Sequence, residues 1–280
     1  MTIPKVIYQS WKTKKLPEYA QKNADLLKKL NPDYKYELYD DNDCRKFLLD
    51  NFGKNYVNAF DALIPGAYKC DFWRYAILYV KGGVYIDIDL TPLVPFSEIL
   101  PPTAELVSVS DRPMNGYPGI YQAFVATIPK HPILLNCLQF TFSNIANRIE
   151  LSHNLSITGP ALMAVAMNIY FGRELTNSYL PSGIYQKGKI ILYRPELTTF
   201  NYCYDLNGKP IFALPSATEK TNMILSDSTD YRKAKVYKDD FRSKLHNSDK
   251  LTYSVFFIII FILVVMVCKY RKLYLKCSNR

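Results

Sequence analysis

The sequence AYKCDFWRYAILYVKGGVYIDIDLTPL occupies residues 67–93 of this 280-residue chain. From Gly66 to Lys81, apolar residues recur at helical spacing, and the pair Gly82-Gly83 is typical of a helix end. The following run, Val84–Leu90, is rich in β-branched residues and predicts a strand that ends at Thr91-Pro92. A helix, a glycine pair and an apolar strand in this order indicate a layered α/β fold.

Two aspartates, Asp87 and Asp89, lie near the end of the predicted strand. Side chains of a strand alternate between its faces, so both carboxylates are expected on one side, with Ile86 and Ile88 in the core. Neighbouring carboxylates repel each other unless a cation lies between them and a partner. A hard divalent ion bridged to a diphosphate meets that need and predicts a nucleotide-sugar site. The alternative is an exposed strand end without a ligand, but Asp87 lies among strongly apolar residues.

A second pair of charged residues, Asp71 and Arg74, lies on the preceding predicted helix. Their i, i+3 spacing places them on one helical face. One interpretation is a salt bridge on the helix surface, and the other is an ion pair at the mouth of the site that contacts sugar hydroxyls. Their position just before Gly82-Gly83 and the two aspartates favours the second interpretation.

The rest of the chain also alternates between strand and helix signals. Strands are predicted at 3–11, 35–39, 105–110, 123–128 and 189–193, and helices at 19–30, 132–148 and 160–171. A further helix that runs toward Phe52-Gly53 is expected to be capped by Asn42 or Asp43. In a chain with 49% hydrophobic residues, this alternation predicts one sizeable α/β core rather than two full domains.

The formal net charge of +10 comes largely from the C-terminal part of the chain. Tyr231–Lys250 carries seven Lys or Arg and three acidic residues. Residues 269–280 carry five Lys or Arg and no acidic residue. Between them lies an 18-residue apolar run, Leu251–Cys268, which is about 27 Å long as a helix. Basic flanks favour a single transmembrane helix over a buried core segment. No nucleic-acid partner is expected, because the chain has neither zinc-finger spacing nor an RNP-like motif.

These features predict a catalytic domain over 1–230, a basic juxtamembrane linker over 231–250, a transmembrane helix over 251–268 and a basic tail over 269–280. No signal peptide is expected, because the N-terminus has no apolar stretch of that length. The basic residues that flank the predicted span are almost balanced, so the catalytic domain is expected either in the cytosol or in the secretory lumen. Six scattered cysteines predict neither a disulfide framework nor a zinc site, and Cys268 and Cys277 are candidates for palmitoylation.

Several motifs taken together resemble one known family. They are IPKVIYQSWK (Ile3–Lys12), NPDYKYELYDD (Asn31–Asp41), GIYQAFVATIPKHPIL (Gly119–Leu134), TGP (Thr158–Pro160) and the block that contains Asp71, Arg74, Gly82-Gly83, Tyr85, Asp87 and Asp89. Over residues 3–160 the chain is similar to glycosyltransferase family 32. These DXD-containing sugar transferases include initiating α-1,6-mannosyltransferases and the catalytic subunits that mannosylate inositol phosphoceramide. The chain departs from the family at Tyr8, where His is usual, and in the C-terminal metal-ligand motif, for which His246 is a weak substitute candidate.

The resemblance implies a GT-A fold, a UDP- or GDP-sugar donor, a divalent cation (Mn²⁺ or Mg²⁺) and retention of the anomeric configuration. It implies that Asp89 binds the metal directly, and that Asp87 contacts the metal shell, the ribose or the sugar. Asp71 and Arg74 are implied to hold hydroxyls of the donor sugar.

Two aromatic residues complete the predicted donor site. Trp11 matches a Trp that stacks on the donor base in related toxin glucosyltransferases, with core packing as the alternative. Tyr85, in the block around the two aspartates, is also included among the residues that bind the donor.

The chain is therefore expected to be a membrane-anchored, metal-dependent, retaining hexosyltransferase. Its expected partners are a nucleotide sugar, a glycan or glycolipid acceptor and membrane lipid. A second class is an inactive, membrane-tethered protein that binds carbohydrate or nucleotide with the same fold, which the intact Asp71, Arg74, Asp87 and Asp89 argue against. A third class, a metal-dependent phosphatase or nuclease, would need more acidic or His ligands.

Overall fold

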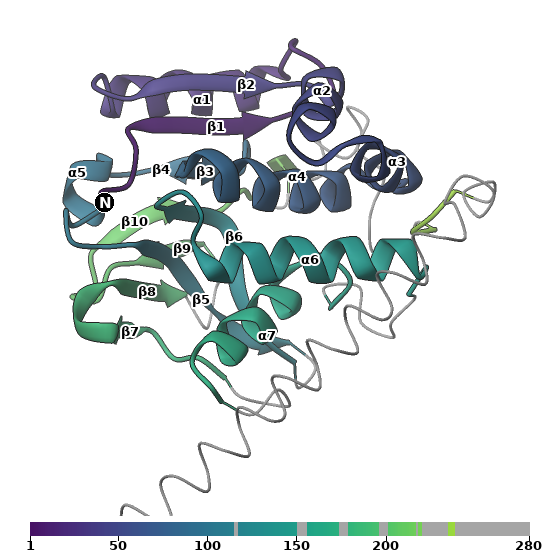
Figure 1. Cartoon of the computed structure of the whole chain (residues 1–280). Coiled ribbons are helices and arrows are strands. Elements are labelled where there is room, and N and C mark those ends of the chain that lie inside the picture. Colours follow the sequence, from purple (N-terminus) through teal and green to yellow (C-terminus); the bar gives the residue numbers. More distant parts are fainter. Residues whose placement is uncertain are drawn as a thin grey trace, which may run out of the picture. The chain divides into compact units, whose positions relative to one another are not determined.

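The computed structural model describes residues 1–114, 117–149, 156–173, 179–195, 201–216, 218–219 and 235–238. These residues belong to one compact unit, Met1–Lys238. It contains a ten-stranded sheet in the order β2-β1-β3-β6-β5-β8-β9-β10-β4, with β7 paired to β8 (Figure 1). The predicted α/β class is confirmed.

The elements alternate along the chain as the sequence suggests. The strands are β1 (Val6–Ser10), β2 (Lys35–Tyr39), β3 (Gly83–Ile86), β4 (Thr91–Pro92), β5 (Leu106–Met114), β6 (Tyr117–Thr127), β7 (Gly183–Tyr185), β8 (Ile190–Pro195), β9 (Tyr202–Tyr204) and β10 (Pro210–Ala213). The helices are α1 (Glu18–Leu30), α2 (Asp41–Phe52), α3 (Lys54–Ala62), α4 (Gly66–Lys81), α5 (Phe96–Ile99), α6 (Pro132–Ala146), α7 (Pro160–Tyr170) and the short 3-10 helix η2 (Gln186–Gly188).

The directions of the central strands bring several strand ends to one edge. Strand β1 runs parallel to both β2 and β3, and β5 runs parallel to β8. Strand β6 is antiparallel to its neighbours β3 and β5, so β1, β2, β3, β5 and β8 all point the same way. Their carboxyl ends therefore meet at one edge of the sheet, which is where ligands bind in open α/β sheets.

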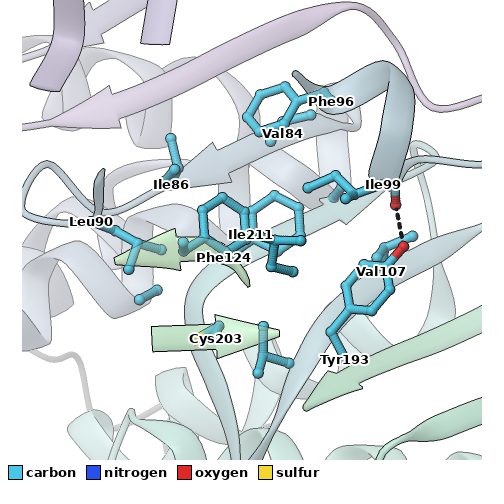
Figure 2. Close-up of a cluster of buried hydrophobic side chains, with 14 of the residues drawn as sticks. Val84, Ile86, Leu90, Phe96, Ile99, Val107, Phe124, Tyr193, Cys203 and Ile211 are labelled. Carbon is cyan, nitrogen blue, oxygen red and sulfur yellow. Dashed lines mark hydrogen bonds between the residues drawn. The ribbon is translucent and has the colours of Figure 1, made fainter. Parts of the chain in front are cut away.

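Apolar side chains bury both faces of the sheet. On one face, Val84 and Ile86 of β3 pack with Phe124 of β6, with Leu27 of α1 and with α5 in a single buried cluster (Figure 2). Helix α4 lies against the other face, beside α6 (Figure 1), and its residues from Asp71 to Leu78 are all buried. Strand β3 is thus covered on both sides, which explains its uninterrupted apolar sequence.

The turn between α4 and β3 has the predicted glycines for a steric reason. Gly82 and Gly83 have φ angles of +63° and +103°, a region that disfavours residues with a side chain. A Cβ atom on Gly82 would lie 2.6 Å from the backbone N of Pro129, and one on Gly83 would lie 2.8 Å from the carbonyl oxygen of Val6. The pair therefore allows α4 to end directly against β1 and β6.

Two local predictions are wrong. The strand predicted over Val84–Leu90 ends at Ile86, and residues 87–90 form a turn closed by the N–H of Leu90 on the carbonyl of Asp87, at 3.1 Å. The cap of α2 is Asp40 rather than Asn42 or Asp43. Its carboxylate accepts from the N–H groups of Asn42 and Asp43, and the Asp43 side chain accepts from the Asp40 N–H in a capping box.

The predicted linker over 231–250 also requires correction, because part of it belongs to the compact unit. Tyr237 is completely buried, and its hydroxyl donates to the carbonyl of Ile149 at 2.9 Å. The N–H of Ile64 donates to the carbonyl of Val236 at 2.9 Å, so this segment pairs with the chain between α3 and α4. Residues 235–238 therefore belong to the same compact unit as the predicted catalytic domain.

The predicted transmembrane helix at 251–268, the basic tail at 269–280, His246, Cys268 and Cys277 all lie outside the described residues. Among the helices that the structure does describe, none combines the length and the apolar composition needed to cross a membrane.

Candidate active site

The two aspartates of the DXD motif lie in the turn that follows β3. Helix α1 holds this turn, since the hydroxyl of Tyr19 donates to the carbonyl of Asp89 at 2.7 Å and the amide of Asn23 donates to the carbonyl of Ile88 at 3.4 Å. Asp87 and Asp89 are half-buried and Ile88 is buried. The alternation in exposure that the sequence predicted is present, but side-chain hydrogen bonds to the turn hold it rather than a strand ladder.

Asp87 is fixed by two buried side chains. Its Oδ1 accepts from the Tyr85 hydroxyl at 2.8 Å and from Nη2 of Arg74 at 2.9 Å. Tyr85 also contacts Sγ of Cys70 at 2.7 Å, and the Arg74 guanidinium lies 4.3 Å from the centre of the Tyr85 ring. Within the described part of the chain, the second carboxylate oxygen of Asp87 accepts no hydrogen bond. It is therefore the oxygen that a ligand can use.

Asp71 and Arg74 form a buried ion pair, so the interpretation as a surface salt bridge is wrong. The side chains of Asp71 and Arg74 are 9% and 4% exposed, whereas that of Asp87 is 29% exposed. Nη2 of Arg74 lies 3.3 Å from Oδ1 of Asp71 and 2.9 Å from Oδ1 of Asp87, so one guanidinium links both carboxylates. Asp87 is the most accessible member of this group.

Two further residues hold Asp71 and were not among the predicted site residues. Gln122 of β6 donates from Nε2 to Oδ1 of Asp71 at 2.5 Å, and Thr158 donates from Oγ1 to Oδ2 at 2.7 Å. The backbone carbonyl of Gln122 also accepts from Nη1 of Arg74. Both residues lie in motifs that carried the family resemblance, which was the signal that could have identified them.

The charges of the site reflect this burial. Burial raises the pKa of Asp71 to about 6, against the opposite effects of Arg74 and of the Thr158 hydroxyl. Burial by itself lowers the pKa of Arg74, but Asp87, followed by Tyr85 and Asp71, holds it well above its usual value. The guanidinium therefore stays charged, and Asp71 is mostly ionised at pH 7.

Trp11 lies at the same edge of the sheet. It directly follows Ser10, the last residue of β1, and its N–H donates to the carbonyl of Tyr39 at 3.0 Å. Since Tyr8 is aligned with Tyr85 in the parallel register, Ser10 is level with Asp87. Trp11 is only partly buried, so its side chain is not one of the buried core residues.

The aspartates of the turn are the residues that could hold a metal ion. Asp87 and Asp89 are both half-buried and lie two residues apart, and neighbouring carboxylates favour a cation between them and a partner. No group of three His, Cys, Asp or Glu side chains that could hold a metal occurs among the described residues. Mg²⁺-type ions commonly take one or two carboxylates together with the phosphates of a substrate. The two aspartates of the turn fit that donor set.

Comparison with known proteins places these residues in a recognised region. Residues 17–105 match the model of a family described as the glycosyltransferase sugar-binding region containing a DXD motif. This segment includes Asp71, Arg74, Tyr85, Asp87 and Asp89. The resemblance to DXD-containing sugar transferases is confirmed.

Three relatives illustrate the similarity. Mannosyl phosphorylinositol ceramide synthase SUR1 of Saccharomyces cerevisiae is 31% identical over 143 residues, which cover 49% of this chain and 34% of the yeast protein. An uncharacterized glycosyltransferase, L373, of Acanthamoeba polyphaga mimivirus is 27% identical over 178 residues, or 62% of this chain and 68% of the viral protein. Inositol phosphoceramide mannosyltransferase 2 of Schizosaccharomyces pombe is 40% identical over 87 residues, or 31% of this chain and 25% of that protein. The match thus spans about a third or a quarter of the length of these two yeast proteins.

Proposed function

Because residues 17–105 carry the sugar-binding region of the DXD-containing glycosyltransferases, we propose that this protein transfers a sugar from a nucleotide-sugar donor to a glycan or glycolipid acceptor. The observation that carries the proposal is the turn at Asp87 and Asp89, which buried Arg74 and Tyr85 hold at the carboxyl edge of the sheet. This arrangement suits a GT-A fold, in which the donor lies at such an edge.

Asp87 and Asp89 would hold Mn²⁺ or Mg²⁺ in this proposal. The ion, when bound, neutralises charge on the diphosphate of the donor and so makes it a better leaving group. The second oxygen of Asp87, which accepts no hydrogen bond from the described residues, and the partial exposure of both aspartates support this assignment. Arg74 stays charged and fixes Asp87 from the buried side, so the carboxylate does not have to reorganise during the reaction.

The remaining residues would bind the rest of the donor. Trp11 would stack on the base of a UDP- or GDP-sugar, and its position level with the turn and its partial exposure support this role. Asp71 and Arg74 would face the sugar hydroxyls. Tyr85 is 1% exposed and its hydroxyl is taken by Asp87 and Cys70, so we assign it the task of orienting Asp87. The names of two relatives favour a mannosyl donor and a sphingolipid acceptor.

The reaction would retain the anomeric configuration. The acceptor hydroxyl attacks on the face that the diphosphate leaves, and the departing diphosphate takes its proton, so no residue of this chain is assigned as a base. The chain's own contribution is to place the donor and to stabilise the charge of the leaving group. We further propose that residues 251–268 anchor the domain in a membrane, where a lipid acceptor is concentrated.

A donor screen tests the proposed function. The full-length protein is incubated with Mn²⁺ and, separately, with GDP-mannose, UDP-glucose and UDP-galactose, and release of the nucleoside diphosphate is measured. We expect one donor to be hydrolysed slowly without an acceptor and faster with a glycolipid acceptor. Arg74→Met should lose this activity, because it leaves Asp87 and Asp71 without their shared cation. Binding of a nucleotide sugar without any turnover would instead indicate an inactive binding protein.

A further inference from the structure

Four buried residues form a ring of polar contacts behind the ion pair. The hydroxyl of Tyr75 contacts Oε1 of Gln122 and lies 3.0 Å from the carbonyl of Thr158. Gln122 and Thr158 in turn each donate to one oxygen of Asp71. Asp71 and Tyr75 are four residues apart on α4, Gln122 belongs to β6, and Thr158 precedes α7. The ring thus joins three parts of the fold at one carboxylate.

The ring determines the orientation of the Gln122 amide. An ionised carboxylate accepts only, so Nε2 of Gln122 faces Asp71 and Oε1 faces the Tyr75 hydroxyl. The backbone carbonyl of Gln122 accepts from Nη1 of Arg74 at 2.5 Å, so the same residue contacts both members of the ion pair. Gln122 is 5% exposed and Thr158 is completely buried, so water does not compete for these contacts.

The ring also limits what Asp71 can bind. A carboxylate has about four lone-pair positions. Gln122 and Thr158 each take one of them, at 2.5 and 2.7 Å, and Nη2 of Arg74 lies 3.3 Å from Oδ1 as an ion pair. Each oxygen of Asp71 is therefore held by one donor, and the 9% exposed side chain has few acceptor positions left for a ligand.

We propose that Gln122 and Thr158 are positioning residues that make Asp71 specific for a single hydroxyl of the donor sugar. This inference rests on the proposed function, since it requires a sugar next to Asp71. A carboxylate held through both oxygens cannot turn to follow a displaced hydroxyl, so it distinguishes a sugar with a hydroxyl in reach from one without it. A site built to bind a hydroxyl rejects the analogue that lacks it far better than an apolar pocket does.

The experiment compares donors that each lack one hydroxyl. The substrates are the preferred donor from GDP-mannose, UDP-glucose and UDP-galactose, and its mono-deoxy analogues. The variant is Gln122→Met, which has a similar volume but removes the amide. The control is Thr127→Val at the last residue of β6, which is completely buried and loses hydrogen bonds to backbone carbonyls only. For each protein, the ratio of kcat/KM between the full donor and each analogue is measured, together with Tm.

In the wild type we expect a large kcat/KM ratio between the full donor and one analogue, the one that lacks the hydroxyl that donates to Asp71. Gln122→Met should lower that ratio at least about tenfold and leave the ratios for the other analogues unchanged. Thr127→Val should lower Tm without changing any ratio. An unchanged set of ratios in folded Gln122→Met overturns the inference.

Thr158 gives an independent variant that acts on the other oxygen of Asp71. Thr158→Val has the same shape as threonine but no hydroxyl, and Thr158→Ser keeps the hydroxyl. If Gln122→Met does not fold, Thr158→Val should show the selective loss and Thr158→Ser should restore the ratio. Equal ratios in Thr158→Val and the wild type contradict the proposal. A wild type that neither binds nor hydrolyses any of the three nucleotide sugars would instead contradict the proposed function itself.

Discussion

Replacement of Tyr85 by Phe tests how the site holds Asp87. The substitution removes one oxygen atom from a residue that is 1% exposed and keeps the ring that packs 4.3 Å from the Arg74 guanidinium. The lost atom donates to Oδ1 of Asp87 at 2.8 Å, so Arg74 becomes the one remaining hydrogen-bond donor to that carboxylate among the described residues. A hydrogen bond to a charged group contributes about 1.5–3 kcal/mol.

This loss should be seen mainly in metal affinity. Residues that orient a metal ligand typically change affinity or activity by about 10–100-fold, which corresponds to about 1.4–2.7 kcal/mol and agrees with the value of the lost hydrogen bond. We therefore expect Tyr85→Phe to need about 10–100-fold more Mn²⁺ for half-maximal donor hydrolysis. The stability cost should be modest, with Tm about 2–8 °C lower.

The assay is the initial rate of donor hydrolysis against Mn²⁺ concentration, after removal of bound metal with a chelator. Tyr193→Phe is the matched control, because the Tyr193 hydroxyl donates to the carbonyl of Ile99 at 2.7 Å in the apolar cluster (Figure 2). It should lower Tm by a similar amount and leave the Mn²⁺ dependence unchanged. If Tyr85→Phe shows the wild-type Mn²⁺ dependence and rate, Asp87 does not depend on Tyr85 and the reasoning fails.

Three other predictions address the base, the acid stability and the C-terminal boundary. Trp11→Ala should raise the donor KM more than it changes kcat, because the lost stacking contact contributes about 1–3 kcal/mol to donor binding. An unchanged KM in a folded variant would show that Trp11 is not part of the donor site. Burial lowers the pKa of His131 to about 4, below the value of 6.5 expected in the unfolded chain, so the protein should lose up to about 3 kcal/mol as the pH falls between these values. His131→Asn keeps an acceptor for the Ile133 N–H but has no imidazole to protonate, so its stability should fall less between pH 7 and pH 4.5. If the unfolding free energies of the wild type and the variant fall equally over this range, the prediction for His131 is wrong. A chain cut after Lys250 should be a soluble, folded domain that still hydrolyses the donor. A chain cut after Asp230 should have a free energy of unfolding about 3–5 kcal/mol lower, because it lacks buried Tyr237. Equal Tm values for the two truncated chains would refute the inclusion of residues 235–238 in the domain.

Local sequence signals predicted the centre of the fold well. Helix α4 has the predicted bounds, because its apolar spacing and the following glycine pair are both strong. Gly82 and Gly83 are required by backbone contacts to Pro129 and Val6, but their identity alone indicated the turn. Strand β2 has the predicted bounds as well.

The end of β3 could not be predicted from its own residues. The sequence from Val84 to Leu90 keeps a strand-like pattern throughout, yet the strand stops at Ile86. The amides and hydroxyls that satisfy the carbonyls of residues 86–89 belong to Gln9, Tyr19 and Asn23, which are about 65–78 residues distant in the chain. A pattern within one segment does not contain that information.

The burial of Asp71 and Arg74 was missed for a similar reason. Their i, i+3 spacing showed that they share a helical face but not what covers that face. The cover comes from Gln122 and Thr158, which are 51 and 87 residues away from Asp71. Motif resemblance had marked both segments as significant without giving these two residues a role.

The central claim is that the carboxylates after β3 hold a divalent ion with the donor, and Asp89→Asn tests it most directly. The amide has nearly the same shape as the carboxylate but no charge, and Asp89 lies half-buried in a turn, so Tm should stay close to that of the wild type. We measure Mn²⁺-dependent donor hydrolysis by both proteins, with and without excess chelator. We expect chelator to abolish wild-type activity and Asp89→Asn to lose at least about a hundredfold in rate, which corresponds to about 3 kcal/mol. Full wild-type activity in excess chelator, or near-native turnover by folded Asp89→Asn, would contradict the central claim.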